Sequence, residues 1–305
     1  MKKTTLTILA FMLALTVVAQ PLYVGTYNLR NQNDGDARNG NGWTHRCQVI
    51  CDMLNFEQPD IFGTQEGLIG QLRDMKKALN GYDYIGVGRD DGKIDGEHSA
   101  IFYRTDKFKL LDHGDFWLNE TPNVPKLGWD AACVRICSWG KFKDKKTKLK
   151  FYYFNLHMDH VGIVARREGA KLVVQKIKEI AGEKAAVILT GDFNVDQTNE
   201  IYGIFTGEGK LNDSYVIARQ RFCENGTFNA FNSDLKTNSR IDHIFLTPGF
   251  EVSNYGVLTN CYWTEDKNAE ATHEGDSPSE LRFKRFTRRT PSDHYLVLAR
   301  INYRK

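Results

Sequence analysis

Residues 186–194 constrain the fold of this chain more than any other segment. They read Ala-Val-Ile-Leu-Thr-Gly-Asp-Phe-Asn, an apolar run that stops at a glycine, an aspartate and an asparagine. A continuous apolar run of this length is typical of a β-strand covered on both faces of its sheet. Polar groups at the end of such a strand lie at the rim of the sheet, where α/β proteins build their sites. Gly-Asp-x-Asn also forms ordinary turns, so this segment alone decides nothing.

The same transition from apolar strand to polar residues recurs five times. The groups at the other strand ends are Tyr27-Asn28, Gln65-Glu66, the run 155–160, Arg240-Ile241-Asp242-His243 and Ser292-Asp293-His294. If the six ends converge, they form an acidic, histidine-bearing pocket suited to a hard divalent cation and an anionic substrate. Each polar residue taken singly is equally well explained as a strand cap or a satisfied core group.

Composition indicates one soluble globular domain. The chain has 305 residues, of which 41% are hydrophobic and 26% charged, and it shows no repeat, low-complexity tract or shift in composition. Hairpin-like segments between 82 and 142 and helical patterns over 44–57, 71–79 and 166–180 indicate a layered α/β fold with mixed sheets. We expect Thr44 to cap the first of these helices.

The first 19 residues differ from the rest. A short basic start (Met1-Lys2-Lys3) precedes an apolar stretch over 6–18, and Val17-Val18-Ala19 fits the small-residue cleavage rule. A first core strand or a membrane anchor is the alternative, but the stretch is short for a membrane span. We therefore expect a signal peptide over 1–19, a domain over 20–305, and an exported protein, periplasmic or extracellular, without a stable membrane span.

The low net charge of the chain excludes a broad basic surface for binding nucleic acid. Loss of Lys2 and Lys3 with the leader lowers the formal net charge from +3 to +1, so any affinity for nucleic acid must come from local patches. The lysines around 141–150 are more typical of a solvated hairpin tip than of a binding site.

Six cysteines do not make a disulfide scaffold in a chain of this length. Two Cys-x3-Cys pairs, Cys47 with Cys51 and Cys133 with Cys137, lack the tight Cys-x2-Cys turn of zinc sites, so buried apolar cysteines are the better interpretation. Cys223 and Cys261 are the candidates if any pair forms in an exported protein.

The polar strand ends carry the groups that phosphoester cleavage needs. Glu66 is a natural carboxylate ligand for Mg²⁺, and Asn28 can add a neutral oxygen. Asp192 can orient or deprotonate water, and the Asn194 amide can donate to a phosphoryl oxygen. The two histidines of the set, His157 and His294, can stabilise developing charge or act as base and acid. Asp242 is the candidate partner that fixes the tautomer of His294.

These motifs, in this order, resemble the endonuclease/exonuclease/phosphatase superfamily. The resemblance rests on Asn28, Gln65-Glu66, Asn155-x-His157, Gly191-Asp192-Phe193-Asn194, Arg240-Ile241-Asp242 and Ser292-Asp293-His294, and it covers essentially the whole chain after residue 19. It implies a four-layered α/β sandwich, with two mixed β-sheets packed face to face and helices outside. It also implies phosphoester hydrolysis that depends on Mg²⁺ or Mn²⁺.

The resemblance also implies roles for these residues. Asn28, Glu66 and Asp293 correspond to the metal site. His157 and Asn194 correspond to phosphate contacts, Asp192 to the water-activating residue, and Asp242 with His294 to a carboxylate–histidine pair.

Within the superfamily the chain is most similar to exported bacterial proteins related to deadenylase-type 3′-5′ exonucleases. This placement rests on segments 88–92 and 101–104, on Glu97 and on Gly128-Trp129-Asp130-Ala131-Ala132. His243 stands where a tyrosine is frequent, and His160 adds an imidazole after Asp159.

The substrate stays open, because one fold hosts nucleases, inositol-phosphate phosphatases and sphingomyelinases. In the segment 282–289, basic and aromatic residues are interspersed. This pattern is typical either of a site that binds single-stranded nucleic acid or of a solvated loop. Arg104 and Arg135 are further candidate contacts to the phosphoester substrate. Phe116-Trp117-Leu118 and Tyr262-Trp263 suit a lipid surface or, more commonly, core packing. We favour a nuclease narrowly over a phosphatase, and we expect neither a catalytically silent binding module nor a protein partner.

Overall fold

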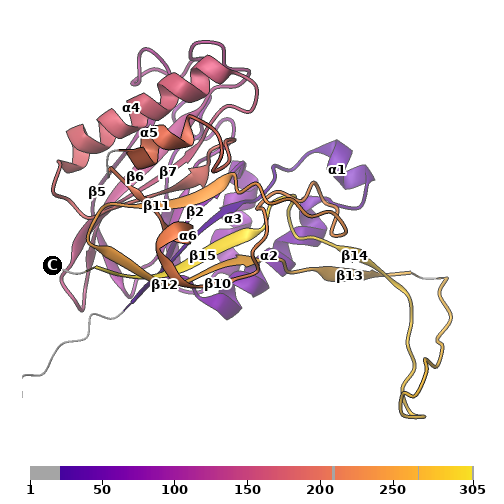
Figure 1. Cartoon of the computed structure of the whole chain (residues 1–305). Coiled ribbons are helices and arrows are strands. Elements are labelled where there is room, and N and C mark those ends of the chain that lie inside the picture. The colour runs from indigo at the N-terminus through magenta and orange to yellow at the C-terminus, as the bar shows by residue number, and fades with distance from the viewer. Residues whose placement is uncertain (1–20, 208–209, 267, 304–305) are drawn as a thin grey trace, which may run out of the picture.

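The computed structural model describes residues 21–207, 210–266 and 268–303 (Figure 1). Its first sheet has seven strands, and both parallel and antiparallel pairs occur in it. In sheet order the strands are β10 (Ala218–Phe222), β12 (Phe250–Leu258), β15 (Leu296–Tyr303), β1 (Leu22–Asn28), β2 (Ile61–Gln65), β4 (Ile101–Arg104) and β3 (Tyr82–Ile85). The leader expected over 1–19 lies outside the described residues. Among the helices that are described, none is long and apolar enough to cross a membrane.

The second sheet has six strands and is also mixed. In sheet order the strands are β5 (Phe108–Trp117), β6 (Ile136–Asp144), β7 (Lys150–His157), β8 (Val187–Asp192), β11 (Asp242–Leu246) and β9 (Asn212–Asp213). Every residue of β8 is buried, as the apolar run over 186–189 predicts.

Helices cover the outer faces of the two sheets, and the remaining short helices lie in loops (Figure 1). They are α1 (Asp34–Arg38), α2 (Trp43–Glu57), α3 (Ile69–Ala78), α4 (Ile163–Ala181), α5 (Tyr202–Thr206) and α6 (Ser214–Ile217). One apolar cluster lies between α2, α3 and the first sheet, a second between the two sheets, and a third between the second sheet, α4 and α5. The predicted four-layered α/β sandwich is therefore confirmed.

Three helix starts differ from the prediction. Helix α3 begins at Ile69, two residues earlier than predicted. Helix α2 begins at Trp43 after Gly42, so Thr44 lies inside the helix and does not cap it. Helix α4 begins at Ile163, three residues earlier than predicted. The carboxylate of Asp130 accepts the backbone N–H of Ala165 at 2.6 Å, so it caps the first turn of α4 from a distant loop. No local sequence signal reports a cap that comes from another segment.

Strand directions bring the polar strand ends to one edge of the sandwich. Strands β1 and β2 run parallel, as do β7 and β8, so Asn28, Glu66, His157 and Asp192 follow the same ends of their sheets. Strand β11 runs antiparallel to β8, and its first residue, Asp242, lies directly opposite Asp192. Strand β15 runs antiparallel to β1, so the segment before it reaches the same edge. The expected convergence occurs.

Buried polar bonds link the two sheets beneath this edge. The hydroxyl of Tyr153 on β7 donates to Gly25 O of β1 at 2.6 Å and accepts Gly63 N of β2 at 3.1 Å. The Asn155 side chain donates to Thr64 O at 2.8 Å and accepts Gln65 Nε2 at 2.7 Å. All of these groups are buried, so each bond replaces lost hydration and fixes one sheet against the other.

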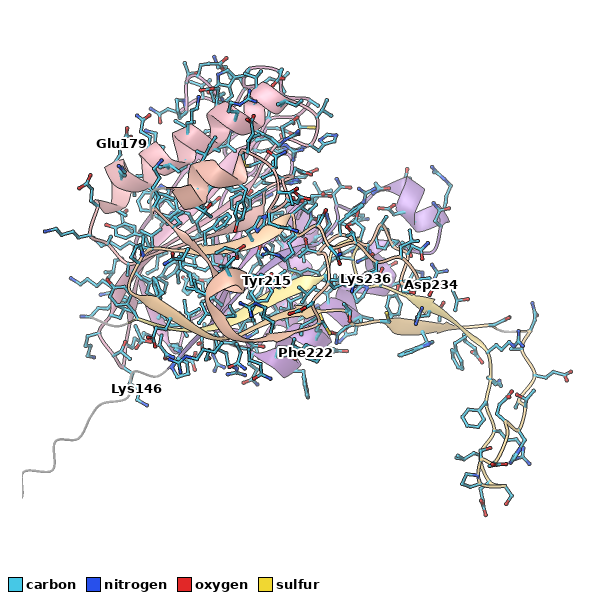
Figure 2. All side chains as sticks on the ribbon, in the orientation of Figure 1. Lys146, Glu179, Tyr215, Phe222, Asp234 and Lys236 are labelled. Carbon is cyan, nitrogen blue, oxygen red and sulfur yellow. The ribbon has the colours of Figure 1, made fainter. Side chains whose placement is uncertain are left out.

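A two-stranded arm of β13 (Tyr262–Glu265) and β14 (Phe286–Arg289) extends from the body (Figure 1). Trp263 on this arm is exposed, whereas Phe116-Trp117-Leu118 is buried, as its core interpretation predicts. The lysines at the tip of the β6–β7 hairpin lie at the surface; Figure 2 labels Lys146 among them.

Candidate functional site

A cavity of about 550 Å³ opens at the edge where the strand ends meet. Seven of the predicted site residues line it: Glu66, Arg135, His157, Asp192, Asn194, Asp293 and His294. Asn28 and Asp242 are fully buried and bond to lining residues from behind. Nine of the ten predicted site residues therefore belong to one site.

Asp242 and Asp192 flank His294. Nδ1 of His294 lies 2.8 Å from Asp242 Oδ2, and its Nε2 lies 3.6 Å from Asp192 Oδ2. Burial alone would lower the pKa of His294, but the two carboxylates outweigh it and hold that pKa well above its usual value. His294 is thus held as an imidazolium between the carboxylates of Asp242 and Asp192.

Asp192 is the group whose pKa is best placed for acid–base work. Burial, followed by the nearby charge of Asp242, raises the pKa of Asp192 to about 7. Its Oδ1 accepts the backbone N–H of Asn194 at 3.0 Å, and its Oδ2 accepts Asn28 Nδ2 at 2.9 Å. A carboxylate with a pKa near 7 is suited to take a proton from water at neutral pH.

Asn28 presents its nitrogen, not its oxygen, to the acidic groups. Nδ2 donates to Glu66 Oε1 at 3.0 Å as well as to Asp192, while Oδ1 accepts the backbone N–H of Arg30 at 2.9 Å. The predicted contact of the Asn28 oxygen with a metal is therefore not the arrangement seen. Asn28 instead holds the two carboxylates in place.

Asn194 orients His157 and has no free donor for a substrate. Its Nδ2 group donates to Met158 O at 2.9 Å and to His157 Nε2 at 3.2 Å. Donation from this amide to a phosphoryl oxygen stays a prediction, and it would require one of these two bonds to break. Burial and then the positive charge of Arg135 keep the pKa of His157 well below its usual value. The neutral ring accepts at Nε2, which places its proton on Nδ1.

Glu66 and Asp293 are cavity-lining carboxylates that could hold a hard cation. Glu66 Oε2 accepts the backbone N–H of Asn31 at 3.1 Å, and Asp293 is 6% exposed with Arg30 Nη1 3.6 Å away. Burial, countered in part by His294, raises the pKa of Asp293, and the charge of Glu66 raises it further. Two repelling carboxylates with spare lone pairs are what Mg²⁺ or Mn²⁺ would stabilise.

Three residues of the site hold left-handed backbone conformations. The φ angles are 54° at Arg30, 62° at Glu66 and 50° at Asn194. Such conformations are uncommon for residues other than glycine and cluster at functional sites. Each follows a strand of the converging set, so the turn aims its side chain back over the sheet edge.

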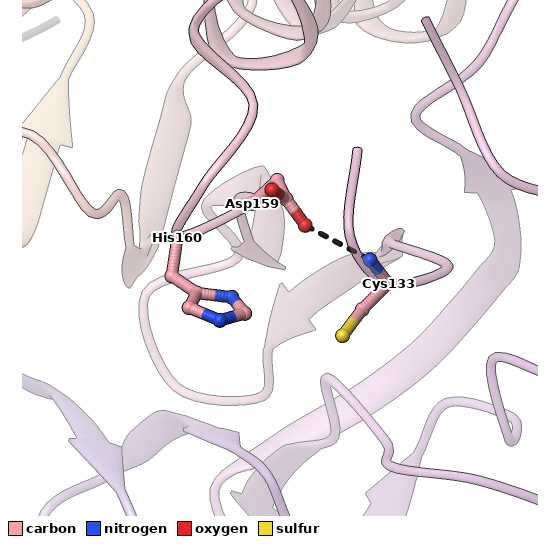
Figure 3. Close-up of side chains that lie close together, drawn as sticks. All are labelled: Cys133, Asp159 and His160. Carbon is pink, nitrogen blue, oxygen red and sulfur yellow. Dashed lines mark hydrogen bonds between the residues drawn. The ribbon is translucent and has the colours of Figure 1, made fainter. Parts of the chain in front are cut away.

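Arg135 lies in the cavity, as predicted, and is held by the loop after β7. Its Nε lies 3.4 Å from Asp159 Oδ2, and its Nη2 bonds to His160 Nδ1 at 3.0 Å. Asp159 also accepts the backbone N–H groups of Cys133, Ala132, Val161 and Gly162; Figure 3 shows the bond to Cys133. Because all these donors occupy its two oxygens, Asp159 organises the loop and is a poor candidate for a metal ligand.

Arg104 is the predicted site residue that lies elsewhere. Strand β4 runs antiparallel to β2 and pairs Tyr103 with Ile61, so Arg104 at its end reaches the opposite edge of the sheet. There its guanidinium binds the carboxylate of Asp106, with Nη2 to Oδ2 at 2.8 Å. An arginine at a strand end carries no sign of which edge that end will reach.

Eight lining residues were not among the predicted site residues: Arg30, Asn31, Arg89, Glu97, Cys133, His160, Phe228 and Ile241. Arg30 and Asn31 follow Asn28 directly, so their position in the sequence was an available signal. Arg89 and Glu97 belong to the segment that supported only the family placement. Phe228 packs edge-on to His294 with ring centroids 5.0 Å apart, and nothing local marks it.

Several other predicted features lie away from the cavity. His243 is buried among aromatic rings and its Nε2–H donates to Val195 O at 3.0 Å, so it is a core residue. All six cysteines are free; the candidate pair Cys223 and Cys261 is not joined. Cys51 and Cys137 lie in separate apolar clusters, which rules out a four-cysteine cluster.

The basic and aromatic segment 282–289 lies on and before β14 of the arm. Arg288 pairs with Asp234, which Figure 2 labels near the base of the arm, and Lys284 Nζ lies 3.5 Å from Glu265 Oε1. Among the described residues that line the cavity, none comes from this segment.

Comparison with known proteins agrees with this architecture. A model of the endonuclease/exonuclease/phosphatase family matches residues 25–294. A mannosyl-6-phosphatase from Bacteroides thetaiotaomicron is 52% identical, with a TM-score of 0.85 over 92% of this chain and 100% of that one. A family protein of known structure from the same organism is 53% identical, with a TM-score of 0.86 over 93% of this chain and 98% of that one.

A more distant relative is the 3′-5′-exoribonuclease subunit Ccr4 of the CCR4-Not complex from Debaryomyces hansenii. It is 26% identical over 218 residues, which cover 58% of this chain and 24% of that protein. Members of the family are phosphoesterases. Since the family model spans most of the sequence, from Gly25 of β1 to His294, this chain belongs to the endonuclease/exonuclease/phosphatase family.

Proposed function

We propose that this protein is a metal-dependent phosphatase that hydrolyses the phosphomonoester of a sugar 6-phosphate. The observation that carries the proposal is the cavity of about 550 Å³. Its lining brings together Asp192 and His294, the carboxylates of Glu66 and Asp293, and Arg135. The 52% identity to a mannosyl-6-phosphatase over 92% of the chain supports the substrate class.

The location of residues 282–289 removes the main support for a nuclease. That segment was the feature of the sequence best suited to hold single-stranded nucleic acid, yet it lies away from the cavity, and two of its cations, Lys284 and Arg288, pair with Glu265 and Asp234. A nucleic-acid substrate requires uncompensated cations along its backbone path. The relation to Ccr4 keeps a 3′-5′ exonuclease as the alternative that the experiment must address.

Glu66 and Asp293 would hold the cation, Mg²⁺ or Mn²⁺. The family typically uses divalent metals, and the ion supplies charge neutralisation at the phosphate. Within the protein, Asn28 and the backbone N–H of Asn31 keep Glu66 in place. Arg30 lies 3.6 Å from Asp293 and lines the cavity, where its guanidinium can bind a phosphoryl oxygen.

Asp192 and His294 perform the proton chemistry. Oδ2 of Asp192 accepts a proton from the attacking water, for which its pKa of about 7 is suited. As the water oxygen bonds to phosphorus, the bond from phosphorus to the sugar oxygen breaks, and the Nε2–H of His294 gives its proton to that oxygen so that the sugar leaves as an alcohol; Asp242 keeps the imidazole charged and oriented. His157, fixed by Asn194, forms the neutral wall beside Asp192, with 3.5 Å between Nε2 and Oδ2.

Phosphate release from a small panel tests the proposal. The full chain is assayed with Mg²⁺ on mannose 6-phosphate, on 4-nitrophenyl phosphate and on a single-stranded oligonucleotide, with chelator and Asp192→Asn as controls. We expect metal-dependent release of inorganic phosphate from the sugar phosphate, lost in Asp192→Asn. Cleavage of the oligonucleotide with no release from either monoester would overturn the proposal in favour of the nuclease.

A further inference from the structure

One wall of the cavity has no role in the chemistry described so far. It consists of Arg89, Glu97, Arg135 and His160, which we call the distal wall. It lies beyond the ring of His157, whose Nε2 faces Asp192 at 3.5 Å and whose Nδ1 faces Glu97 Oε2 at 3.9 Å. We propose that the distal wall recognises the hydroxyl groups of the substrate's sugar ring. This inference rests on the proposed phosphatase function and assigns the part of the site that selects the substrate.

The charges of the distal wall are compensated in pairs. Arg89 forms an ion pair with Glu97, and Arg135 lies 3.4 Å from the buried carboxylate of Asp159 and bonds to His160. The wall therefore offers N–H donors and carboxylate acceptors side by side with little net charge. A sugar hydroxyl both donates and accepts, so it matches such a surface. A second phosphate group, as in an oligonucleotide, would need unpaired cations.

Two buried polar atoms, one on this wall and one on the adjoining His157 ring, have a carboxylate oxygen only at 3.8 Å (Asp90 Oδ1) and 3.9 Å (Glu97 Oε2), beyond hydrogen-bond distance. Arg89 Nε and His157 Nδ1 make no hydrogen bond, although the Arg89 side chain is only 14% exposed and His157 only 7%. Both line a side cavity of about 10 Å³ between Glu66, Glu97 and Arg135. Buried donors without partners are costly and rare in folded proteins. A substrate hydroxyl group, or a water molecule that bridges to the substrate, would give these two atoms a hydrogen-bond partner.

The loop that presents Arg89 and Glu97 is braced before any substrate arrives. The backbone N–H of Arg89 donates to Glu97 O at 3.0 Å, and Trp117 Nε1 donates to Arg89 O at 2.6 Å. Asn31 Nδ2 donates to Glu97 Oε1 at 2.9 Å, which ties this loop to the one that holds Glu66. A Cβ atom at Gly88 would lie 2.2 Å from Asp95 O, so the close crossing of the loop requires glycine. A loop that is already ordered loses little conformational entropy when a substrate binds, as a recognition surface requires.

Substrate selectivity tests the assignment. The kcat/KM values for mannose 6-phosphate and for 4-nitrophenyl phosphate, which has no hydroxyl groups, are measured for the full chain and for Arg89→Gln and Glu97→Gln. We expect the ratio of the first value to the second to fall about 10-fold or more in each variant, mainly through KM for the sugar phosphate. Lys93→Gln is the matched control, because Lys93 is exposed on the same loop; it should leave the ratio unchanged.

The other outcomes separate this inference from the proposed function. An unchanged ratio, or an equal fall in kcat/KM for both substrates, would overturn the sugar-binding role of the distal wall while leaving the phosphatase intact. If the unmodified protein releases phosphate from neither monoester but cleaves an oligonucleotide, the proposed function itself fails and this inference falls with it.

Discussion

Asp242 and Asp192 lie directly opposite each other on the antiparallel strands β11 and β8, and His294 lies against both carboxylates. The register of the β8–β11 pair therefore sets the distance between Asp192, the proposed base, and Asp242, which orients His294, the proposed acid. A slip of one residue would turn either side chain to the other face of the sheet. The residues after Asp242 on β11 are all buried, and their apolar packing keeps that register.

Replacement of Asp242 by asparagine should lower kcat by about 10²–10⁴-fold, because His294 loses the carboxylate that charges and orients it. Since Asp242 raises the pKa of His294, the variant should also lose its remaining activity at a lower pH on the alkaline side. The measurement is a pH–rate profile with mannose 6-phosphate. Asp112→Asn, at an exposed position of β5, is the control. A kcat within 3-fold of the unmodified protein, roughly 0.7 kcal/mol, would exclude this role.

Replacement of Glu66 by glutamine should raise the Mg²⁺ concentration needed for half-maximal activity about 10-fold or more, because a neutral amide is a weaker ligand for a hard cation. Activity is titrated with metal after chelator treatment. Glu183→Gln removes a carboxylate from an exposed turn and should titrate like the unmodified protein. An identical titration for Glu66→Gln would remove this residue from the metal site.

Acid sensitivity should be traceable to Asp159. Burial works to raise the pKa of this carboxyl, but the backbone N–H groups of Gly162, Val161 and Ala132 outweigh burial and lower the pKa to about 2. Its stabilising contribution is complete above the unfolded-state pKa of about 3.9 and is lost as the pH falls toward 2.

Asp159→Asn should therefore lower the free energy of unfolding by about 1–2 kcal/mol at pH 6 and by less at pH 3. Urea unfolding at pH 6, 4 and 3 measures the difference. The exposed Asp112→Asn change should show no such trend. A destabilisation by Asp159→Asn that is constant over this pH range would contradict the ionic origin of the effect.

Two features of the sequence, the apolar runs and the polar residues that end them, together predicted that the strand ends converge. Apolar runs locate the strands, and the polar residues that end them would be costly anywhere but at a sheet edge. Arg104 shows where this reasoning fails: its strand end reaches the other edge because β4 runs antiparallel to β2. Strand direction depends on the whole topology and leaves no local trace.

The contacts between distant segments were also invisible in the sequence. At Gly63, an added Cβ would lie 2.1 Å from Asn155 Oδ1, so glycine there reports the approach of the second sheet. Asn194 reads as a phosphate donor by its motif, yet its amide is committed to Met158 and His157. Residue type and order predict which groups meet at the site. Which atom each group presents depends on neighbours that only the folded chain brings close.

Arg46 provides the last test, because it joins the loops that carry the site. Its side chain is fully buried and donates to four backbone carbonyls: Leu29 O and Asn41 O at 2.7 Å, and Arg30 O and Pro291 O at 3.0 Å. These loops carry Asp293, which we propose holds the cation, and Arg30, which we propose binds a phosphoryl oxygen. Replacement by methionine keeps the bulk of the chain but leaves the carbonyls without donors, at a cost of about 3–5 kcal/mol.

Arg46→Met should therefore lower the unfolding free energy by that amount and also weaken the response to Mg²⁺, because Asp293 is no longer held near Glu66. Arg38→Met, an exposed arginine on α1, is the matched control and should change neither quantity. Thermal unfolding and metal titration on the same samples separate the two effects. A variant that is less stable but titrates with Mg²⁺ normally would show that Arg46 supports the fold alone, since a loop in the wrong place cannot preserve the affinity of the ligand it carries.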